Sequence, residues 1–550
     1  MTAVPPSFAL ADLYEGVCDA LPDAEALVVG SAGEIVSRLT FAVLDERANR
    51  LANGLLAEGV VAGDRVGLHL RNHAEHVEAM LGVFKARAVP VNVNFRYTAE
   101  ELAYLITDST MAALFTEADL APVAREAARL AGRPDVVVVE RGNGYEGLLA
   151  GASTARPAVG ERTGDDLYLL YTGGTTGAPK GVMWRQHDIY MASFGGKGTP
   201  NRGIPPVAEP AEVVRRAVDG SPVLRRFPLC PLMHGAAAWT AWQSLLGGGA
   251  VVIDSDVHLD PGAALRLAQS AEADLVMVVG DAVARPLADA LGAARAVDPS
   301  ALPLNRLQLI ASGGAILSPA VKEQLRALLP DVGILDSFGS SETGSQGRLR
   351  PGPSGGAPLL VGDAATTVLD TSAEGGARGP VPADGTTVGK LSQRGHVPLG
   401  YWGDADRTTA TFPVIDGVRW AVSGDDAVIE ADGSIRVLGR GSASINTGGE
   451  KVFPEEVEGV LKGHPAVFDA LVVGMPDERF GQRVTAVVAV RRGSPAPSAE
   501  ELAAHARGHL AGFKVPRSWV LTDHVARSAS GKPDYRWARD AVLASSDQES

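Results

Sequence analysis

The chain has 550 residues, which is too long for one compact core and predicts two to four domains. Its formal net charge of -15 excludes nucleic acid as an expected partner, because such a surface repels phosphate backbones. The two cysteines, Cys18 and Cys230, lie far apart, which excludes a disulfide framework and a thiolate zinc site. No signal peptide is visible, and no apolar run is long enough to cross a bilayer. We therefore expect a cytoplasmic protein with no membrane span.

The first 300 or so residues alternate strand-like and helix-like patterns. A strand is predicted over 65–70, a helix over 74–86 from apolar residues at helical spacing, and a strand over 88–93. Two further units follow, with strands over 274–281, 307–314 and 333–338 and helices over 282–291 and 318–329. Such alternation with nearly continuous apolar strands predicts parallel sheets covered on both faces. Ligands of these sheets bind beyond the carboxyl ends of the strands.

The remaining segments differ in character. Residues 195–226 are rich in Pro, Gly and Arg and are interpreted as a loop insertion, whereas 351–389 suggest a small β-rich subdomain. After Arg440 the pattern predicts a helix over 454–461, strands over 470–473 and 486–490, and a helix over 498–510. The predicted fold is α/β. A large N-terminal domain, 1–440, has parallel-rich sheets with helices on both faces plus the β-rich subdomain, and a small mobile α+β domain, 441–550, follows.

The most informative stretch is YTGGTTGAPKGV at 171–182, directly after a strand predicted over 167–170. Its glycines let backbone N–H groups approach phosphate, its threonines donate hydroxyls, and Lys180 adds a positive charge. A flexible surface loop is the alternative that composition alone favours. The stretch is not a P-loop, because Gly181 follows Lys180 where Ser or Thr would hold magnesium.

This stretch resembles the phosphate-loop signature of the adenylate-forming superfamily, which includes acyl-CoA synthetases, peptide synthetase adenylation domains and firefly luciferase. Gly173 replaces the usual serine. Further stretches resemble the family's later motifs in the same order, namely PLMH at 231–234, DSFGSSE at 336–342, SGD at 423–425, GR at 439–440, NTGGEKVFPE at 446–455 and SASGK at 528–532. The resemblance covers nearly the whole chain.

The resemblance implies a role for each matching residue. ATP and AMP would bind to the phosphate stretch, the adenine slot, and Asp425 with Arg440 at the ribose. This set comprises Thr172, Gly173, Gly174, Thr175, Thr176, Gly177, Lys180, Gly313, Gly314, Ala315, Asp336, Phe338, Asp425 and Arg440. Ser341 would offer its hydroxyl to the α-phosphate, and Glu342 would hold Mg²⁺, a hard cation that prefers carboxylate oxygen. His234 and Gly235 would line the acid pocket, and Gly448, Gly449 and Lys451 would serve the second step with coenzyme A.

Lys532 is the catalytic residue that the resemblance implies for the first half-reaction. It would bridge the substrate carboxylate and the α-phosphate while negative charge develops. The small domain would then rotate about the hinge, and the CoA thiol would attack the acyl-adenylate and release AMP. Ser442 stands where acyl-CoA ligases usually carry a charged pivot, which leaves the second step less supported than the first. A homodimer, and a partner enzyme or carrier protein in that step, remain open alternatives.

Four longer stretches are YTGGTTGAPKGVMWR at 171–185, DSFGSSETG at 336–344, GRGSASINTGGEKVFPEEVE at 439–458 and SASGKPDYRW at 528–537. They resemble those of actinobacterial ligases for steroid side-chain acids and of related ligases for other polycyclic terpenoid acids. Small residues after His234 leave room for a bulky ring system, although alanines also pack ordinary helices. A long-chain fatty acid is the alternative substrate. Transfer to a carrier protein, a luciferase-like oxygenase and a non-enzymatic nucleotide-binding role are the alternative functions. His73 and His76 are interpreted as a solvated first helical turn rather than a metal site, and no G-x-S-x-G elbow supports a serine hydrolase.

Overall fold

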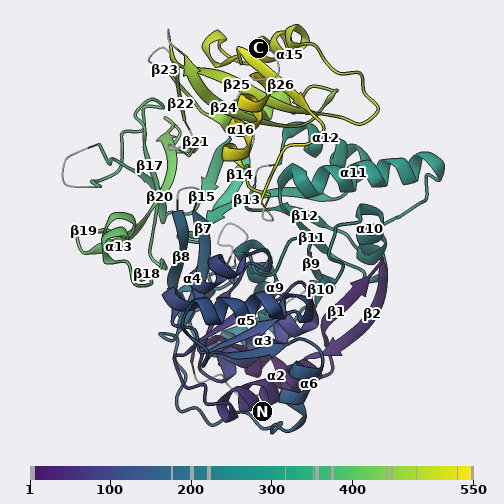
Figure 1. Ribbon diagram of the computed structural model, residues 1–550, viewed down its shortest axis with the longest axis vertical. Helices are drawn as coiled ribbons and strands as arrows, with labels where there is room; N and C mark the ends of the chain where they lie inside the picture. The colour runs from purple at the N-terminus through teal and green to yellow at the C-terminus, as the bar shows by residue number, and fades with distance from the viewer. Residues whose placement is uncertain are drawn as a thin grey trace.

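The protein is described from a computed structural model (Figure 1). The structure describes residues 7–174, 177–198, 204–219, 224–315, 317–350, 352, 358–372, 377–440, 444–447, 450–477, 480–528 and 531–546. Among these residues three β-sheets form, two in the large domain and one in the small C-terminal domain. The small domain lies at the top of Figure 1, and the N-terminus lies at the opposite end. No helix in the described ranges is both long and apolar enough to span a membrane.

The first sheet of the large domain is parallel over its central strands. In spatial order these are β13 (Gly333–Ser340), β12 (Leu309–Ser312), β11 (Leu275–Val278), β9 (Arg226–Pro228), β10 (Val251–Asp254) and β1 (Glu25–Ser31), with β2 (Glu34–Thr40) antiparallel at the edge. The strands β1, β9, β10, β11 and β12 are short and mostly buried, as the sequence predicts for strands covered on both faces, whereas β13 and the edge strand β2 are mostly not buried.

The predicted β-rich subdomain is a continuation of this sheet. Beyond β13 the antiparallel strands are β14 (Gly344–Arg350), β15 (Leu359–Gly362), β21 (Ile435–Arg440), β20 (Val418–Ile429), β17 (Gly389–Arg394) and β16 (Thr366–Leu369), and β19 (Val414–Ile415) pairs with β20. The prediction of a β-rich segment is confirmed, but hydrogen bonds join it to the parallel strands without a break.

The second sheet has the order β18 (Gly400–Tyr401), β8 (Gly177–Arg185), β7 (Leu167–Gly174), β4 (Val89–Asn92), β3 (Arg65–His69), β5 (Ala113–Thr116) and β6 (Val137–Glu140). It is parallel from β7 to β6, and antiparallel pairing occurs at one edge only, through β8 and β18. The strands predicted over 65–70 and 88–93 are confirmed as β3 and β4, and the helix between them as α3 (Ala74–Lys85).

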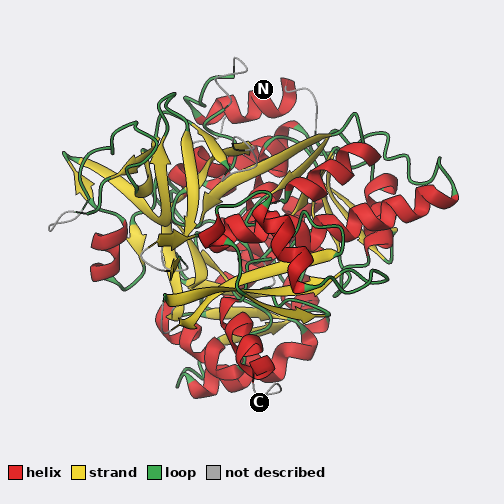
Figure 2. Cartoon of the chain, turned by 90° about the horizontal axis from the view of Figure 1, so that it is seen from above, coloured by secondary structure: helices red, strands yellow, loops and turns green. Residues whose placement is uncertain are grey.

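Helices pack between the two sheets and on their outer faces, and Figure 2 shows helices on both sides of the strands. The middle layer packs against both sheets and consists of α1 (Leu10–Ala20), α2 (Phe41–Ala57), α3, α7 (Gln186–Ser193) and α9 (Gly235–Leu246). The first sheet is covered outside by α10 (Pro261–Ser270), α11 (Gly280–Val297) and α12 (Pro319–Leu328), and the second by α4 (Ala99–Ser109) and α5 (Ala121–Leu130). The shorter helices are η1 (Ala118–Leu120), α6 (Asn143–Ala150) and α13 (Ala405–Thr411).

The small domain has one sheet with helices on both faces. Its strands are β23 (Glu450–Val452), β22 (Ile445–Thr447), β25 (Gly481–Val490), β24 (Val467–Asp477) and β26 (Ser518–Thr522). Helices α14 (Pro454–Leu461) and α15 (Ala499–Arg507) pack on one face and α16 (Tyr535–Ser546) on the other. The short helix η5 (Gly512–Lys514) lies between α15 and α16 in the sequence. The predicted α+β unit is confirmed.

Two local predictions are wrong. Residues 195–226 were expected to be a loop insertion, but they contain α8 (Pro210–Asp219), whose Val213, Val214 and Ala217 are buried. An apolar side at helical spacing outweighs the flanking prolines and glycines there. The first turn of α3 is not solvated either, because His76 is only 1% exposed and its Nδ1 lies 3.3 Å from the Leu70 carbonyl oxygen.

Candidate active site

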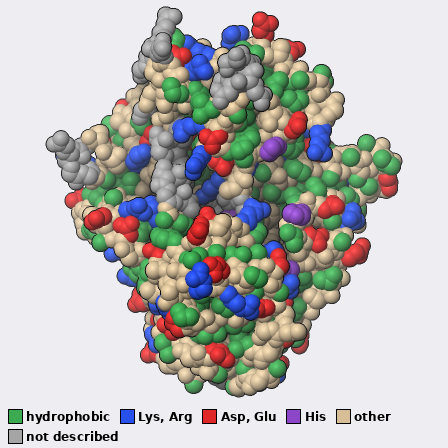
Figure 3. Space-filling view, in the orientation of Figure 1, with side chains coloured by type: hydrophobic (Ala, Val, Ile, Leu, Met, Phe, Trp, Pro, Cys, Tyr) green, Lys and Arg blue, Asp and Glu red, His purple; other side chains and the backbone are tan. Residues whose placement is uncertain are grey.

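Four neighbouring parallel strands bring the predicted site together at their carboxyl ends. Met277 on β11 is in register with Pro228 on β9 and with Ala311 on β12, and Ser312 is in register with Asp336 on β13. The segments that follow these strands therefore meet at one edge of the sheet. They carry His234, Val279, Gly313 and Ser341. Figure 3 shows Lys and Arg side chains around the hollow between this edge and the small domain.

The glycine-rich stretch is the tip of a hairpin rather than a free loop. β7 and β8 pair antiparallel through it, with Thr172 opposite Lys180. A Cβ atom on Gly181 would lie 2.9 Å from the Tyr171 ring, so the close pairing requires glycine there. Gly173, Gly174 and Gly177 lie on these strands, whereas the predicted phosphate contacts Thr175 and Thr176 lie outside the described residues.

Two asparagines that the sequence analysis missed tie this hairpin to the acid-pocket segment. Asn92 donates to the carbonyl oxygens of Tyr171 and Met233, at 2.8 Å each, and accepts from the Tyr171 N–H. Asn72 donates to the Cys230 carbonyl and accepts from the Leu232 N–H. Asn92 is the last residue of β4, and Asn72 follows the end of β3 by three residues. A polar residue at the carboxyl end of a predicted parallel strand is the signal in the sequence that could have found them.

Glu342, the predicted magnesium ligand, is held by a tyrosine from a distant strand. The Tyr401 hydroxyl donates to Glu342 Oε1 at 3.1 Å, and Lys180 Nζ lies 5.2 Å from the Tyr401 ring centroid. The neighbouring Ser341 carbonyl accepts a hydrogen bond from the buried Trp184 indole at 2.9 Å. Glu342, Ser341 and Lys180 are thus brought together, and Tyr401 and Trp184 are positioning residues that no motif indicated.

The predicted adenine slot lies on β12, β13 and the turn after β12. Gly314 has φ +81, and a Cβ atom on Gly313 would lie 2.5 Å from the Met277 methyl group, so both positions favour glycine. The Ala315 carbonyl accepts from the Ser312 hydroxyl, and Phe338 packs against the antiparallel part of the sheet.

Asp336 is buried and forms an ion pair with Lys322 of α12. Burial raises the pKa of Asp336 above its usual range, although the neighbouring Lys322 ammonium opposes that rise. Lys322 was not predicted from the sequence. Lys322 lies outside the motif in the sequence, so no motif indicates this contact.

His234 is the N-cap residue of the acid-pocket helix α9 and is half-buried. Burial, together with the positive charges of Lys532 and Arg96, lowers the pKa of His234 to about 4. The Nε2 atom of His234 is buried and makes no hydrogen bond within the part of the chain that the structure describes. Next to it, a Cβ atom on Gly235 would lie 3.1 Å from the Trp239 ring. The lowered pKa thus favours the unprotonated imidazole at His234.

Lys532 reaches the large domain on a tight turn of the small domain. Gly531 has φ +70, and a Cβ atom there would lie 2.6 Å from a Val279 methyl group, so the turn packs directly on the end of β11. Arg527 braces the turn, since it donates to the Gly531 carbonyl at 3.1 Å and pairs with both carboxylate oxygens of Asp469.

Residues 15–402 match the AMP-binding enzyme family, and residues 456–532 match the AMP-binding enzyme C-terminal domain. The chain belongs to the AMP-binding enzyme family. It is 45% identical over 549 residues to a medium/long-chain-fatty-acid–CoA/3-oxocholest-4-en-26-oate–CoA ligase of Mycolicibacterium smegmatis, covering 97% of this chain and 96% of the relative. It is 43% identical over 547 residues to a 3-oxocholest-4-en-26-oate–CoA ligase of Rhodococcus rhodochrous, covering 96% and 95%.

The fold of this AMP-binding enzyme is similar to that of the anthranilate CoA ligase AuaEII in complex with anthranoyl-AMP. The TM-score is 0.81 at 22% identity, and the match covers 99% of each chain. The predicted α/β architecture with a small C-terminal domain is confirmed. The boundary at 440/441 stays a prediction, and it falls between the two matched ranges.

The two predicted ribose residues lie near the end of the large domain. Asp425 on β20 is in register with Arg440 on β21, which places the two ribose candidates opposite each other on neighbouring strands. The side chains of Arg440 and Lys451 lie outside the described residues, as do Ser442, Gly448 and Gly449. The roles predicted for the hinge and the second-step loop therefore stay predictions.

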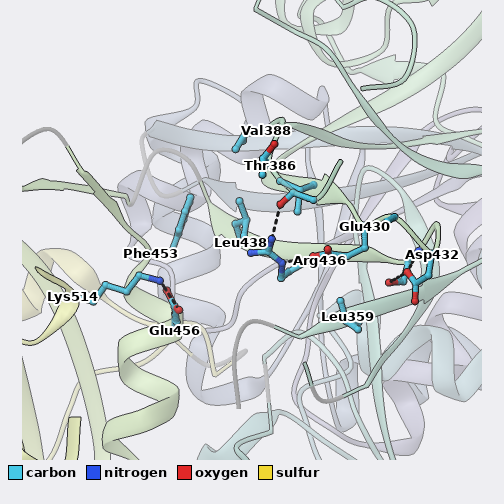
Figure 4. A pocket seen from close by; sticks show the side chains of 14 residues that line it. Leu359, Thr386, Val388, Glu430, Asp432, Arg436, Leu438, Phe453, Glu456 and Lys514 are labelled. Carbon is cyan, nitrogen blue, oxygen red and sulfur yellow. Dashed lines mark hydrogen bonds and ion pairs between the residues drawn. The ribbon is translucent and has the colours of Figure 1, made fainter. Parts of the chain in front are cut away.

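A cavity of about 680 Å³ lies between β20 and β21 on one side and the start of α14 on the other (Figure 4). Its two cations are already paired, Lys514 with Glu456 at 2.7 Å and Arg436 with Glu430 at 2.5 Å. Because these ion pairs neutralise both cations within the protein, the cavity is not expected to bind an anionic ligand.

Proposed function

We propose that this enzyme is an ATP-dependent acyl-CoA ligase that adenylates a bulky carboxylic acid and passes the acyl group to coenzyme A. The observation that carries the proposal is the position of Lys532. Its turn packs on Val279 at the end of β11, and its charge acts on His234 at the start of the acid-pocket helix. An ammonium group held there can neutralise the substrate carboxylate and the α-phosphate together.

In the first half-reaction, the substrate carboxylate attacks the α-phosphorus of ATP and pyrophosphate leaves. We assign the triphosphate to the β7–β8 hairpin with Lys180, and the adenine to the slot formed by Gly313 to Ala315 and Phe338. Asp336, beside Lys322, remains the candidate for the exocyclic amine. Asp425 and Arg440 are the candidates for the ribose, and Ser341 offers its hydroxyl to the α-phosphate.

The donor set at Glu342 fits a magnesium ion. A carboxylate oxygen is the ligand that Mg²⁺ prefers. The Tyr401 hydroxyl orients the Glu342 carboxylate through a hydrogen bond to Oε1 only. We propose that Glu342 holds Mg²⁺ together with the phosphates of ATP. When bound, the ion neutralises the charge of the pyrophosphate leaving group.

In the second half-reaction, the CoA thiol attacks the acyl-adenylate carbonyl and AMP leaves. We propose that the small domain turns at Ser442 before this step, bringing Gly448, Gly449 and Lys451 toward the site. Transfer to a carrier protein or through a partner enzyme is the alternative for the acceptor. A homodimer and a cytoplasmic location remain further proposals.

The favoured acid is a steroid side-chain acid. The relatives from Mycolicibacterium smegmatis and Rhodococcus rhodochrous are named for 3-oxocholest-4-en-26-oate, and they match this chain along almost its whole length. Of the alanines that follow Gly235 on the pocket helix, Ala237 and Ala238 pack in the hydrophobic core, whereas Ala236 and Trp239 are only partly buried. A medium- or long-chain fatty acid is the second candidate, because the first relative is also named for it. A cyclic terpenoid acid is the third.

The test is a panel of acids with ATP and Mg²⁺, with and without CoA, with acyl-AMP and acyl-CoA measured by mass spectrometry. We expect acyl-CoA from steroid side-chain acids at a higher kcat/KM than from fatty acids or benzoates. Acyl-AMP that accumulates while CoA stays unused would reject the ligase proposal and favour another acceptor. Binding of ATP with no adenylate from any acid would favour the non-enzymatic alternative.

A further inference from the structure

Away from the nucleotide site, three metal-ligating side chains gather where α7 meets the segment before β18. His187 and Asp188 are neighbours in the first turn of α7, and His396 lies in the segment before β18. Asp188 Oδ1 is 2.8 Å from His396 Nδ1 and 3.4 Å from His187 Nδ1. The three ligand atoms lie within 4.8 Å of one another, and this is the one such group of His, Cys, Asp and Glu found in the described ranges.

We propose that His187, Asp188 and His396 form a binding site for a divalent transition metal ion of the Zn²⁺, Ni²⁺ or Co²⁺ class. Two imidazoles with one carboxylate suit these ions, whereas Mg²⁺ and Ca²⁺ prefer oxygen ligands alone. The site is therefore chemically distinct from the magnesium site proposed at Glu342. Three protein ligands leave a further coordination position for water.

The spacing of the ligand atoms supports this inference. Ligands about 2.0–2.1 Å from one ion, at angles of about 90–110°, lie roughly 2.9–3.4 Å from each other. The two distances to Asp188 Oδ1, 2.8 and 3.4 Å, agree with that spacing. When the metal ion binds, His396 and Asp188 each form a bond to the ion in place of their direct contact.

The backbone also holds the ligands in place before any ion binds. His396 stands between Gly395, with φ +85, and the buried Val397, and the Leu399 N–H donates to the Met183 carbonyl at 2.8 Å. On the other side, the His187 ring packs edge-on against Phe8 at 4.7 Å. A site whose ligands are already positioned loses little conformational entropy when it binds a metal.

The location gives the ion a structural consequence. The segment that carries His396 runs directly into β18, and β18 carries Tyr401, which contacts Glu342. A metal at this site joins α7 to that segment. It is expected to raise the thermal stability of the enzyme, because a ligand that binds only the folded state stabilises it.

The test uses the full-length protein without a histidine tag, dialysed against a chelator and titrated with Zn²⁺. Equilibrium dialysis with elemental analysis should give one ion per wild-type chain at this site, and the midpoint of thermal unfolding should rise with Zn²⁺. His396→Ala and Asp188→Asn should each weaken this binding about tenfold or more. Both variants should still form adenylate with Mg²⁺ and ATP, which confirms that they fold.

Two histidine variants serve as controls. His258→Ala removes an exposed histidine outside the site. His505→Ala removes the middle ring of a cluster formed by His464, His505 and His509, whose neighbouring ring centroids lie 5.3 and 5.2 Å apart. Both should bind Zn²⁺ as the wild type does. The proposal is overturned if the wild type binds no Zn²⁺, if His396→Ala binds it unchanged, or if only His505→Ala loses it. If the wild type binds no Zn²⁺, the two histidines only form ion pairs with Asp188.

Discussion

The Tyr401 hydroxyl donates a hydrogen bond to Glu342 Oε1 at 3.1 Å, while the ring of the same tyrosine lies 5.2 Å from Lys180 Nζ. One side chain from β18 therefore contacts both charged groups that we assign to the phosphates and magnesium of ATP. Because Tyr401 is itself only 5% exposed, packing fixes its position. Its hydrogen bond therefore holds the Glu342 carboxylate in one orientation.

Tyr401→Phe should weaken the apparent affinity for Mg²⁺ in adenylate formation by about 10- to 100-fold, since the orienting hydrogen bond to the proposed ligand is lost. The measurement is the initial rate of pyrophosphate release against Mg²⁺ concentration. Tyr145→Phe is the matched control, because the Tyr145 hydroxyl also donates to a glutamate, Glu78, at 2.9 Å. An equal Mg²⁺ requirement in both variants would remove Tyr401 from this role.

Gly531→Ala should reduce adenylate formation more than acyl transfer from a preformed adenylate. The new methyl group would lie 2.6 Å from the Val279 side chain and push the Lys532 turn away from the large domain. Gly493→Ala is the control, because Gly493 also has a left-handed φ, +80, but no atom lies within 4 Å of the added methyl. Both variants carry backbone strain of about 1 kcal/mol, so only the contact differs. Equal losses in the two variants would contradict the docking of this turn.

Arg491→Gln should lower the rate of adenylate formation by a factor of about two to five and leave the second half-reaction unchanged. Arg491 of the small domain lies 3.1 Å from Asp289 of the large domain, and this ion pair holds the domains in the orientation that brings Lys532 to the site. The side chains are 30% and 37% exposed, so solvent screening limits the pair to about 0.2–1 kcal/mol. Arg492→Gln is the neighbouring control. Inhibition of both half-reactions alike would mean that the pair stabilises the fold rather than the domain orientation.

The free energy of unfolding should fall as the pH drops from about 6.5 to 4. Burial lowers the pKa of His69, His76 and His234 to about 4, so in this window these groups bind protons in the unfolded chain but stay neutral in the folded enzyme. Protons therefore favour unfolding, with a slope of at most about 1.4 kcal/mol per pH unit for each histidine. Urea unfolding between pH 4 and 7 measures the slope, and His234→Gln should reduce it. A pH-independent midpoint in this range would contradict these shifts.

The fold could largely be predicted because its signals are local. Apolar runs and helical spacing mark β3, α3, β4, α12 and α14, and the structure confirms each within a few residues. The motif residues Glu342, Gly313 and His234 follow strands or begin helices, so the parallel topology alone brings them to one edge of the sheet.

The missed contacts all depend on tertiary structure. Tyr401 reaches Glu342 across 59 positions of the chain, and Trp184 reaches the Ser341 carbonyl across 157. The α8 helix is a different case, because its apolar residues do stand at helical spacing, and the prolines and glycines that flank it outweigh that signal in the sequence. Periodicity and turn composition report what a segment does by itself, and they carry no information about which partner buries it.

The most direct test of the proposed mechanism is a comparison of the two half-reactions in Lys532→Ala. We expect acyl-AMP formation from acid and ATP to fall by about 10²–10³ or more, because a preorganised charged donor to the transition state is lost. Acyl-CoA formation from chemically prepared acyl-AMP should stay close to the wild-type rate. Acyl-AMP formation at the wild-type rate in Lys532→Ala would contradict the assignment of Lys532 and the adenylating geometry built on it.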